Sequence, residues 1–345
     1  MSGRAALEPP RAGGLGATAG SDGSDRDHPG PISAVDQLRA AAADGRLDQP
    51  GHGRTAERFE RLAAVARRSL GAGRLFEAHA DGQTILLEAG WDEPEALGLL
   101  GVWASEGPGP PVSMVGTRSG PALQGTKHFC SGAPVLDHAL VTAHDGARGV
   151  RLVVVDLRGP GVSVGPTTWT GPGMRSALTR SVVLDGAPVV AVVGGPGWYL
   201  GRAGFWHGGI GVAASWFGGA LGVLDAVRGG VDLDDHHGLA HLGEVEASTY
   251  SMRASLERAA AEIDRLPADA AAAHRRSLTV RRVVAQGCVA VLEHAAGALG
   301  PRAMAFDAEH AERIVDLDVY IRQDHGRRDS EQLGRLVVDA IDLRC

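Results

Sequence analysis

Acidic and imidazole side chains gather just after residue 233, and this group has the clearest capacity for metal chemistry in the sequence. Asp234, Asp235, His237 and His241 lie close together, and two histidines one helical turn apart can share a metal ion. The same residues also fit a helix start, because an aspartate before a helix accepts a hydrogen bond from a backbone N–H of its first turn. We expect the helix start, with Asp234 or Asp235 as its cap, and no metal ion.

An aromatic ring and a hydroxyl lie two residues apart in a strand-like segment, at Phe129 and Ser131. Side chains at these spacings point to the same face of a regular strand, so both could contact one flat ring. Lys127, the only lysine in the chain, begins this segment. The alternative is that Phe129 packs in the core of a β domain and that Ser131 is a hydroxyl at the strand end.

The spacing of apolar residues divides the chain into a helical part, a strand-rich part and a second helical part. Residues 1–32 hold almost no large apolar groups, so they bury too little surface to offset the entropy cost of ordering. We therefore expect a disordered tail at 1–32, an N-terminal helical domain at 33–100, a middle β domain at 101–200 and a C-terminal helical bundle at 201–345. The fold class is α+β, and the middle domain is expected to be a small barrel or sandwich.

Glycine, proline and the apolar runs set the expected bounds of individual elements. Gly71, Gly73, Gly82 and Gly90 predict turns between short helices, and the segment 83–88 fits a helix or a strand. Strands are expected where β-branched and apolar residues run together, at 138–143, 150–155 and 181–184. Long helices are expected at 205–227, at 242–266, at 276–299 with a stop at Gly300-Pro301, and once or twice more within 308–342.

Composition limits the compartment and the partners of the protein. The net charge is −7, from 34 basic and 41 acidic residues. The sequence has no dominant basic patch, so we expect neither a nucleic acid nor an anionic membrane as a partner. Cys130, Cys288 and Cys345 are too few and too scattered for a disulfide framework or a zinc motif, which is typical of a cytoplasmic protein. The uncharged run 203–224 is dense in glycine and contains His207, so we expect a buried helix and not a membrane span.

Four segments, in order along the chain, are similar to motifs of one enzyme family. Residues 103–106 (Trp-Ala-Ser-Glu) and 123–132 (Leu-Gln-Gly-Thr-Lys-His-Phe-Cys-Ser-Gly) resemble the Thr-Glu-Pro entry and the Leu-x-Gly-x-Lys-x-Trp-Ile-Thr-Asn strand of the middle domain of acyl-CoA dehydrogenases. Residues 184–189 resemble the Phe-Asp-x-Val-Pro exit from that domain. Residues 294–300 resemble the Gln-x-x-Gly-Gly-x-Gly turn of the C-terminal helices, so the resemblance covers roughly residues 34–340.

The resemblance implies an acyl-CoA dehydrogenase-like fold, bound FAD and an acyl thioester or related acyl substrate that is oxidised at a CH–CH group. It also implies an electron-transfer partner or oxygen as electron acceptor, and a homodimer or homotetramer built on the C-terminal helices. In the family the strand aromatic covers the flavin ring, and the hydroxyl two residues later hydrogen-bonds to it. The residues that the resemblance assigns to cofactor binding are Ala104, Ser105, Phe129, Cys130, Ser131, His294 and Gly297.

Acyl-CoA oxidation also requires a carboxylate that removes the α-proton of the substrate. The family usually supplies it from a Glu-Gly pair shortly after an Arg-Asp pair on the last long helix. Counting onward from Val315-Asp316 puts Asp324 at that position, where it could act as the base. The alternative is a solvated helix residue that pairs with one of the arginines close to it in sequence, Arg322, Arg327 or Arg328.

Some members of the family place the base on the helix that follows the middle domain. That stretch of this chain offers no carboxylate, but it contains His207. An imidazole can transfer protons near neutral pH, so His207 is a second candidate catalytic residue. The alternative is that His207 simply packs in the helix.

Three departures from the family pattern concern the same cofactor. Prolines fill the segment 108–111, where the family has a Gly-Ser pair, and proline cannot donate an N–H. The arginine that reaches the FAD diphosphate of a neighbouring subunit is missing from 227–235, and His294 replaces a glutamine. These features leave two alternatives open: a flavin-dependent monooxygenase of the same fold, which needs no α-proton base, and a non-catalytic scaffold subunit.

Overall fold

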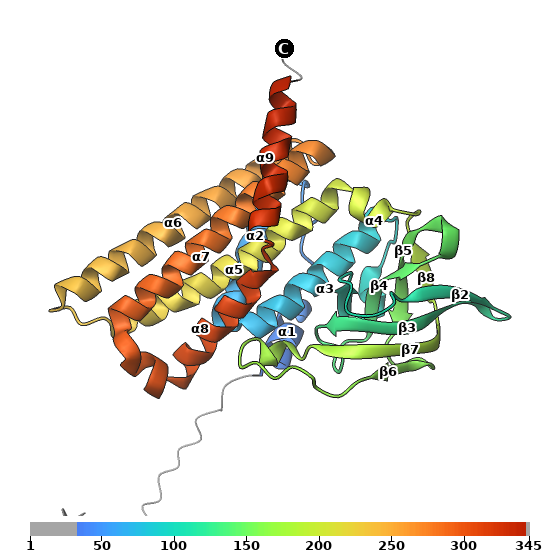
Figure 1. The fold of residues 1–345 in the computed structure, drawn as a ribbon, viewed down its shortest axis with the longest axis horizontal. Helices are drawn as coiled ribbons and strands as arrows, with labels where there is room; N and C mark the ends of the chain where they lie inside the picture. Colours follow the sequence, from blue (N-terminus) through green and yellow to red (C-terminus); the bar gives the residue numbers. More distant parts are fainter. Residues whose placement is uncertain (1–32, 343–345) are drawn as a thin grey trace, which may run out of the picture. The chain divides into compact units, whose positions relative to one another are not determined.

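Helices, strands and helices follow one another along the chain, as the sequence predicts (Figure 1). The structure is a computed structural model, and it describes residues 33–342. The disordered tail predicted at 1–32 and Cys345 lie outside the described residues. Within the described range, residues from Ser33 onward form one compact unit, so the bounds predicted for three separate domains stay predictions.

Two helices of the N-terminal part begin at serine caps. The side chains of Ser33 and Ser69 accept hydrogen bonds from the backbone N–H groups of Asp36 and Ala72, both at 3.2 Å. The segment 83–88 is helical, because it continues a long buried helix. The elements are α1 (Ala34–Ala43), α2 (Thr55–Arg68), α3 (Leu70–Glu88) and the 3₁₀ helix η1 (Pro94–Leu97).

The turns predicted at Gly71, Gly73 and Gly82 are wrong, because all three glycines lie inside α3. Their small size allows neighbouring elements to approach the helix closely. A Cβ atom added at Gly73 would lie 2.5 Å from the Cβ atom of Ala66, which is closer than packed side chains come. Gly90 does follow the helix end, at a φ of +88° that favours glycine.

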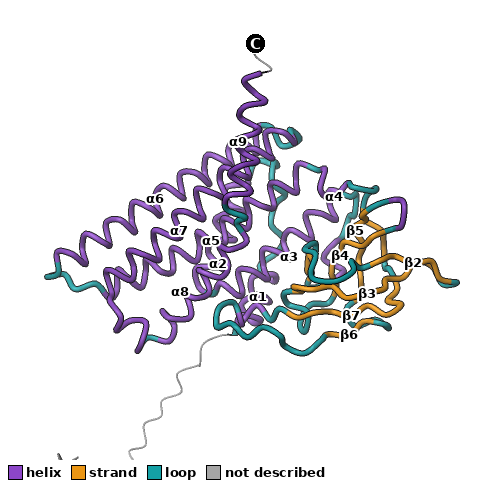
Figure 2. Tube along the Cα trace, viewed as in Figure 1, coloured by secondary structure: helices purple, strands orange, loops and turns teal. Residues whose placement is uncertain are grey.

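The strands between residues 100 and 193 form one hydrogen-bonded network with the order β6-β7-β3-β2-β4-β5-β8, and β1 pairs with β4 in parallel. The strands predicted at 138–143, 150–155 and 181–184 are confirmed. Figure 2 shows the strands gathered in one region beside α3 and α4. The strands are β1 (Leu100–Trp103), β2 (Ser113–Thr117), β3 (Gly120–Cys130), β4 (His138–His144), β5 (Val150–Asp156), β6 (Val162–Val164), β7 (Arg180–Pro188) and β8 (Ala191–Val193), with 3₁₀ helices η2 (Gly146–Arg148) and η3 (Arg175–Ala177) between them.

The C-terminal part consists of long helices that pack on one another. The helix stop predicted at Gly300-Pro301 is confirmed, because Gly300 has a non-helical φ of 63° and ψ of −174°, and a second short helical stretch follows it to Phe306. Asp235 caps the second long helix by accepting the N–H of His237 at 2.9 Å, and no metal-binding group of three side chains occurs among the described residues. The elements are α4 (Trp198–Gly201), α5 (Ala203–Gly230), α6 (His236–Arg265), α7 (Ala270–Phe306), α8 (Ala308–Tyr320), η4 (Ile321–Gln323) and α9 (Arg327–Asp342).

Two of these helices, α5 and α7, are long and apolar enough to cross a membrane by length and composition. In α5, 78% of the most apolar window is buried inside the protein, which confirms the buried helix expected there. In α7 the corresponding share is 28%, so much of this apolar helix is left uncovered by the described residues.

Candidate functional site

Lys127 on β3 ties two parts of the middle domain together. Its side chain is 1% exposed, and Nζ lies 2.8 Å from Thr142 Oγ1, 3.3 Å from Thr142 O and 3.0 Å from Glu106 Oε1. An ammonium group has three N–H donors, and each of them finds an acceptor here. Thr142 Oγ1 also donates to Ala104 O at 3.3 Å. The lysine therefore fixes the segment 104–106 against β4.

The chain leaves regular strand geometry at Phe129, which has a φ of 57°. The pairing of β3 with β7 shifts register between Lys127 and Cys130, which is a bulge. Phe129 is 53% exposed and Ser131 is 9% exposed. The expectation that regular alternation turns both side chains to one face is therefore wrong, because the bulge reorients the chain between them. The exposure of Phe129 also excludes the alternative of a core aromatic.

The hydroxyls of Ser131 and Thr179 meet at 3.1 Å and are surrounded by strained backbone. Besides Phe129, Met174 and Leu178 have positive φ values, of 58° and 50°. Each such non-glycine residue costs roughly 1–2 kcal/mol, and strain of this kind gathers at functional sites. Among the described residues these are the only non-glycine residues with positive φ, and all three lie in the two short segments, 129–131 and 174–179, that carry the hydroxyl pair.

The loop that holds Met174 is attached to α8 by a buried carboxylate. The N–H of Met174 donates to Asp316, which is 4% exposed and stands at the position of the Arg-Asp motif. Burial raises the pKa of Asp316 to about 6, and the hydrogen bond from Met174 opposes that rise. This contact adds to the packing of α3 against β1 and η3, which also joins the helical part to the Ser131 region of the middle domain.

The other predicted cofactor contacts of the middle domain lie beside Ser131 but differ in what they offer. Trp103 Nε1 donates to Ser131 O at 3.2 Å, which brings the segment with Ala104 and Ser105 next to the hydroxyl pair. Ala104 is half-buried and Ser105 is exposed. Cys130 is fully buried, and burial raises the pKa of its thiol to about 12, so its side chain belongs to the core.

Asp324 is held by an ion pair with α7. Its side chain is 4% exposed, and Oδ2 lies 2.9 Å from Nη1 of Arg282. Oδ1 is buried and has no hydrogen-bond partner among the described residues. The alternative of a solvated helix residue paired with an arginine close in sequence is wrong, because Asp324 follows η4, its side chain is buried and its partner is Arg282 on α7.

A single guanidinium, that of Arg281, links the two segments that carry the predicted catalytic residues. Its Nη1 donates to Gly209 O at 2.9 Å and its Nη2 donates to Gln323 O at 2.8 Å. His207 and Asp324 therefore each lie next to a backbone segment held by the same side chain. The structure brings these two regions together, although they are far apart in the sequence.

His207 is buried inside the helical part and is 2% exposed. Burial lowers its pKa to about 4, and the charges of Arg276 and Arg202 act in the same direction. The imidazole is therefore neutral near pH 7. Its Nε2 atom has no hydrogen-bond partner among the described residues.

His294 and Gly297 belong to a different neighbourhood from the Ser131 region. They lie on α7, which packs against α5, α6, α8 and α9, whereas β3 packs within the sheet. His294 Nδ1 lies 3.0 Å from Nδ1 of His241 on α6. A Cβ atom at Gly297 would lie 2.5 Å from Nε2 of His241, so the glycine accommodates that imidazole.

The sequence analysis missed a set of charged residues on α3. Arg74, Glu77 and Asp81 follow helical spacing and lie on one face, toward α5 and the end of α8. Arg74 and Glu77 form an ion pair, and Tyr320 Oη lies 3.5 Å from Glu77 Oε1. The sequence pattern that could have pointed to these residues is the spacing of charges at i, i+3 and i+7 in an otherwise apolar helix that contains glycine.

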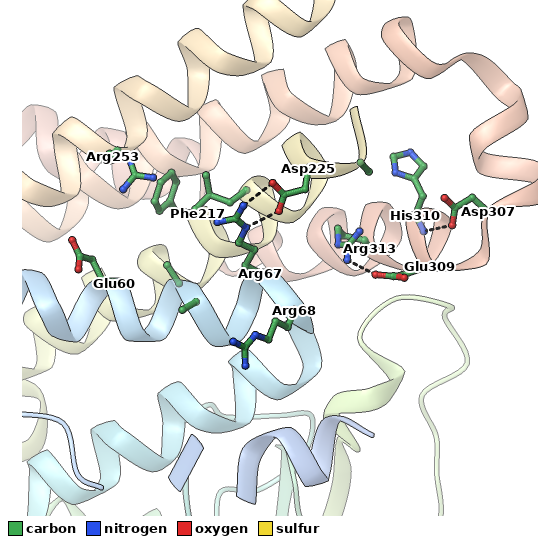
Figure 3. A pocket seen from close by; sticks show the side chains of 14 residues that line it. Glu60, Arg67, Arg68, Phe217, Asp225, Arg253, Asp307, Glu309, His310 and Arg313 are labelled. Carbon is green, nitrogen blue, oxygen red and sulfur yellow. Dashed lines mark hydrogen bonds and ion pairs between the residues drawn. The ribbon is translucent and has the colours of Figure 1, made fainter. Parts of the chain in front are cut away.

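A cavity of about 880 Å³ opens between α2, α5, α6 and α8 (Figure 3). Its lining contains four arginines and four carboxylates, and none of the residues predicted to bind cofactor or to act in catalysis. Arg67 forms a two-contact ion pair with Asp225, at 2.6 Å for both, and Arg313 pairs with Glu309 at 2.7 Å. The balanced charges favour neither an anionic nor a cationic ligand.

Comparison with known proteins gives the context for these regions. Residues 112–187 match the family model of the acyl-CoA dehydrogenase middle domain. The dibenzothiophene monooxygenase TdsC from Paenibacillus sp. A11-2, solved with FMN, superposes with a TM-score of 0.74 at 19% identity, covering 83% of this chain and 84% of that one. Comparison with curated protein sequences finds no match.

Two further solved structures share the fold at low identity. Butyryl-CoA dehydrogenase from Megasphaera elsdenii superposes with a TM-score of 0.70 at 16% identity and covers 81% of each chain. PigA, solved with FAD and proline, gives a TM-score of 0.72 at 16% identity and covers 91% of this chain and 90% of its own. The order of elements, the matched middle domain and these superpositions identify the chain as a divergent protein with the acyl-CoA dehydrogenase fold.

Proposed function

We propose that this protein is a flavin-dependent oxidoreductase that acts on a small molecule. The observation that carries the proposal is the gathering of three strained residues around the Ser131 and Thr179 hydroxyls, beside the segment that resembles a flavin-binding strand. The fold supports it, because TdsC was solved with FMN and PigA with FAD.

The residues around Ser131 offer suitable contacts to the ring of a flavin, whereas the protein offers few contacts to the diphosphate of FAD. Two hydroxyls and the exposed ring of Phe129 offer polar and apolar contacts to a flat heterocycle. In the region where the family has a diphosphate-binding arginine, Arg228 is engaged with Glu246 at 2.5 Å and is followed by acidic residues. We therefore propose that the protein binds the flavin ring, which FMN and FAD have in common. The sequence predicts FAD as the cofactor.

Among flavin reactions, we propose oxygen-dependent monooxygenation. Dehydrogenation of an acyl thioester needs a carboxylate that is free to remove a proton from the substrate. Asp324 is buried and ion-paired with Arg282, and His207 is buried and neutral. Bound reduced flavin would supply the electrons for oxygen, and this chemistry requires no such base.

Oxidation of an acyl thioester at a CH–CH bond is the second candidate. The observation in its favour is Oδ1 of Asp324, which has no hydrogen-bond partner among the described residues. That oxygen could accept a proton if the ion pair with Arg282 opened. This reaction would need an electron-transfer partner in place of oxygen.

The cofactor proposal is tested by titrating the purified full chain with FMN and with FAD and following the visible absorption and fluorescence of the flavin. We expect at least one of them to bind. Ser131→Ala should weaken binding by about fivefold, which is the effect of one neutral hydrogen bond. Ser119→Ala, on the exposed turn before β3, is the matched control and should change nothing. Binding of neither flavin would contradict the proposal and favour the scaffold alternative.

The reaction type is tested with the flavin-loaded protein. Transfer of one oxygen atom from O2 to an added aromatic substrate such as indole, with reduced flavin supplying the electrons and the second oxygen atom leaving as water, supports monooxygenation. Reduction of an artificial electron acceptor by butyryl-CoA, lost in Asp324→Asn, supports dehydrogenation instead.

We also propose that the protein is a homodimer or homotetramer in the cytoplasm. Val283 and Val289 on α7, and Val337 and Val338 on α9, are 37–55% exposed and suit a contact with a second copy. Light scattering on the purified protein gives the mass directly, and a monomer at micromolar concentration would contradict the proposal.

A further inference from the structure

Asp81 is a carboxylate that faces α5 and has no direct partner among the described residues. It lies in the middle of α3 and is half-buried. Burial raises its pKa, while the charges of Arg202, Arg58 and Arg74 oppose that rise. None of the described residues makes a hydrogen bond or a close ion pair with it. Its oxygens are not among the buried polar atoms that lack a partner, so they reach the protein surface and are open to a polar group from outside the chain.

A second polar group with free hydrogen-bonding capacity faces the same place. Tyr199 on α4 is 8% exposed, and its pKa is raised to a value outside the physiological range, first by burial and then by the charge of Asp81. The guanidinium carbon of Arg202 lies 5.3 Å from the centre of the Tyr199 ring, and Arg202 and Asp81 lie against Gly204 and Gly208 of the same helix, so the phenol and the carboxylate belong to one region. The Tyr199 hydroxyl makes no hydrogen bond with any described residue. An O–H group and a carboxylate, both unused, therefore lie in one region.

The backbone of α5 leaves room for these groups because it carries glycine opposite α3. A Cβ atom at Gly208 would lie 2.7 Å from Asp81 Oδ1, and one at Gly204 would collide with Glu88 and Arg202. Gly204 and Gly208 are one helical turn apart and thus lie on the same face of α5. Around Gly204 and Gly208 the seam between α3 and α5 is therefore lined by charged groups and bare backbone, whereas at Gly219 it meets the side chain of Leu70.

Arg202 adds N–H donors without a hydrogen-bond partner to this seam. Its side chain is 6% exposed, and Nη1 pairs with Glu88 at 2.5 Å. Nε and Nη2 are buried and have no hydrogen-bond partner among the described residues. Arg202 exerts the largest charge effect on Asp81, yet the two form no direct ion pair. A polar group of a ligand could therefore bridge them.

We propose that Asp81 and Tyr199 bind a hydrogen-bonding group of the substrate, so that the site takes a hydroxylated or similarly polar small molecule and not a long aliphatic chain. This rests on the proposed function, since it names the substrate class of the same enzyme. Asp81 accepts a hydrogen bond from the substrate group, and Tyr199 donates one to it. Arg202 balances the charge of the carboxylate.

The test compares two probes of nearly equal size, indole and 5-hydroxyindole, by titration calorimetry on the full chain, with and without added FMN. We expect 5-hydroxyindole to bind about tenfold more tightly, as one charge-assisted hydrogen bond provides. Asp81→Asn and Tyr199→Phe should each reduce this preference, and Asp81→Leu should abolish it while indole binding is kept. Glu244→Gln, an exposed carboxylate on α6, is the control and should keep the full preference.

The outcomes separate this inference from the flavin proposal. Equal affinities, a preference for indole, or no binding of 5-hydroxyindole at about 5 mM would overturn it, whether or not FMN binds. A preference that Asp81→Asn and Asp81→Leu both leave intact would also overturn it. If FMN fails to bind but the preference and its loss in Asp81→Asn are seen, the polar site stands and only the flavin proposal falls.

Discussion

At the residue scale, the environment of Lys127 changes the expected cost of a conservative substitution. From the sequence alone, Lys127→Arg is expected to cost little. The structure shows a side chain that is 1% exposed and an ammonium that has three acceptors, so the longer, planar guanidinium does not fit the same space.

We predict that Lys127→Arg lowers the free energy of unfolding by about 1–3 kcal/mol, the usual cost of overpacking a core. Urea unfolding monitored by circular dichroism measures the change. Arg148→Lys, at a side chain that is 74% exposed, exchanges the same residue types on the surface and should stay within about 0.5 kcal/mol of the parent. Equal stabilities of Lys127→Arg and the parent protein would show that the interior adapts.

Asp316 gives a second prediction at this scale. Burial raises its pKa from 3.8 to about 6, so the folded protein binds a proton more tightly than the unfolded chain does. Its contribution to stability is therefore present at low pH and is lost as the pH rises from about 4 to 6. The difference corresponds to about 3 kcal/mol.

Asp316→Asn keeps an oxygen that accepts the N–H of Met174 and removes the buried charge. We expect its free energy of unfolding at pH 8 to exceed that of the parent by up to about 3 kcal/mol, with no advantage at pH 4. Unfolding curves at the two pH values provide the measurement. A variant less stable at both would mean that the carboxylate does more for the Met174 contact than an amide can.

At the element scale, the glycines of α5 have unequal roles that substitution can separate. A Cβ atom at Gly218 would collide with the backbone carbonyl of Ala63 on α2, whereas nothing lies within 4 Å of one at Gly229. We predict that Gly218→Ala destabilises the protein by about 1–3 kcal/mol through overpacking. Gly229→Ala should stabilise it by about 0.5–1 kcal/mol, because alanine favours the helix. Thermal unfolding of the two variants measures the change in Tm, and similar changes for both would refute the close packing of α2 on α5.

At the scale of the whole molecule, two buried histidines make the protein sensitive to acid. Burial lowers the pKa of His79 and of His207 to about 4, from 6.5. Their neutral forms are therefore favoured by folding, so their contribution is complete above pH 6.5 and is lost as the pH falls toward 4. Each accounts for about 3 kcal/mol at the acid end, and together they outweigh the opposite trend of Asp316.

We predict that the free energy of unfolding falls by several kcal/mol between pH 7 and pH 4.5. A difference of one pKa unit between the folded and unfolded states corresponds to about 1.4 kcal/mol. Urea unfolding across that range measures it. His79 Nδ1 accepts the N–H of Leu100 at 3.1 Å, so His79→Asn keeps an acceptor and should flatten the profile. An unchanged slope in this variant would assign the acid sensitivity to other groups.

How much of this arrangement can be predicted from the sequence depends on the range of the interactions involved. Local signals suffice for the order of elements, for the cap at Asp235 and for the buried character of α5. The bulge at Phe129 depends on the register with β7, and the glycines of α3 depend on what packs against them. The ion pair of Asp324 joins the turn between η4 and α9 to Arg282 on α7, and no local pattern encodes this contact.

The interior position of Lys127 has a consequence for the chemistry of the protein surface. The chain contains one lysine, and its ε-amine is enclosed by Thr142 and Glu106. Reagents and enzymes that acylate, methylate or cross-link lysine amines therefore find no accessible lysine on the folded protein. Acylation of Lys127 would report on the opening of the middle domain, and its rate would follow the unfolding equilibrium.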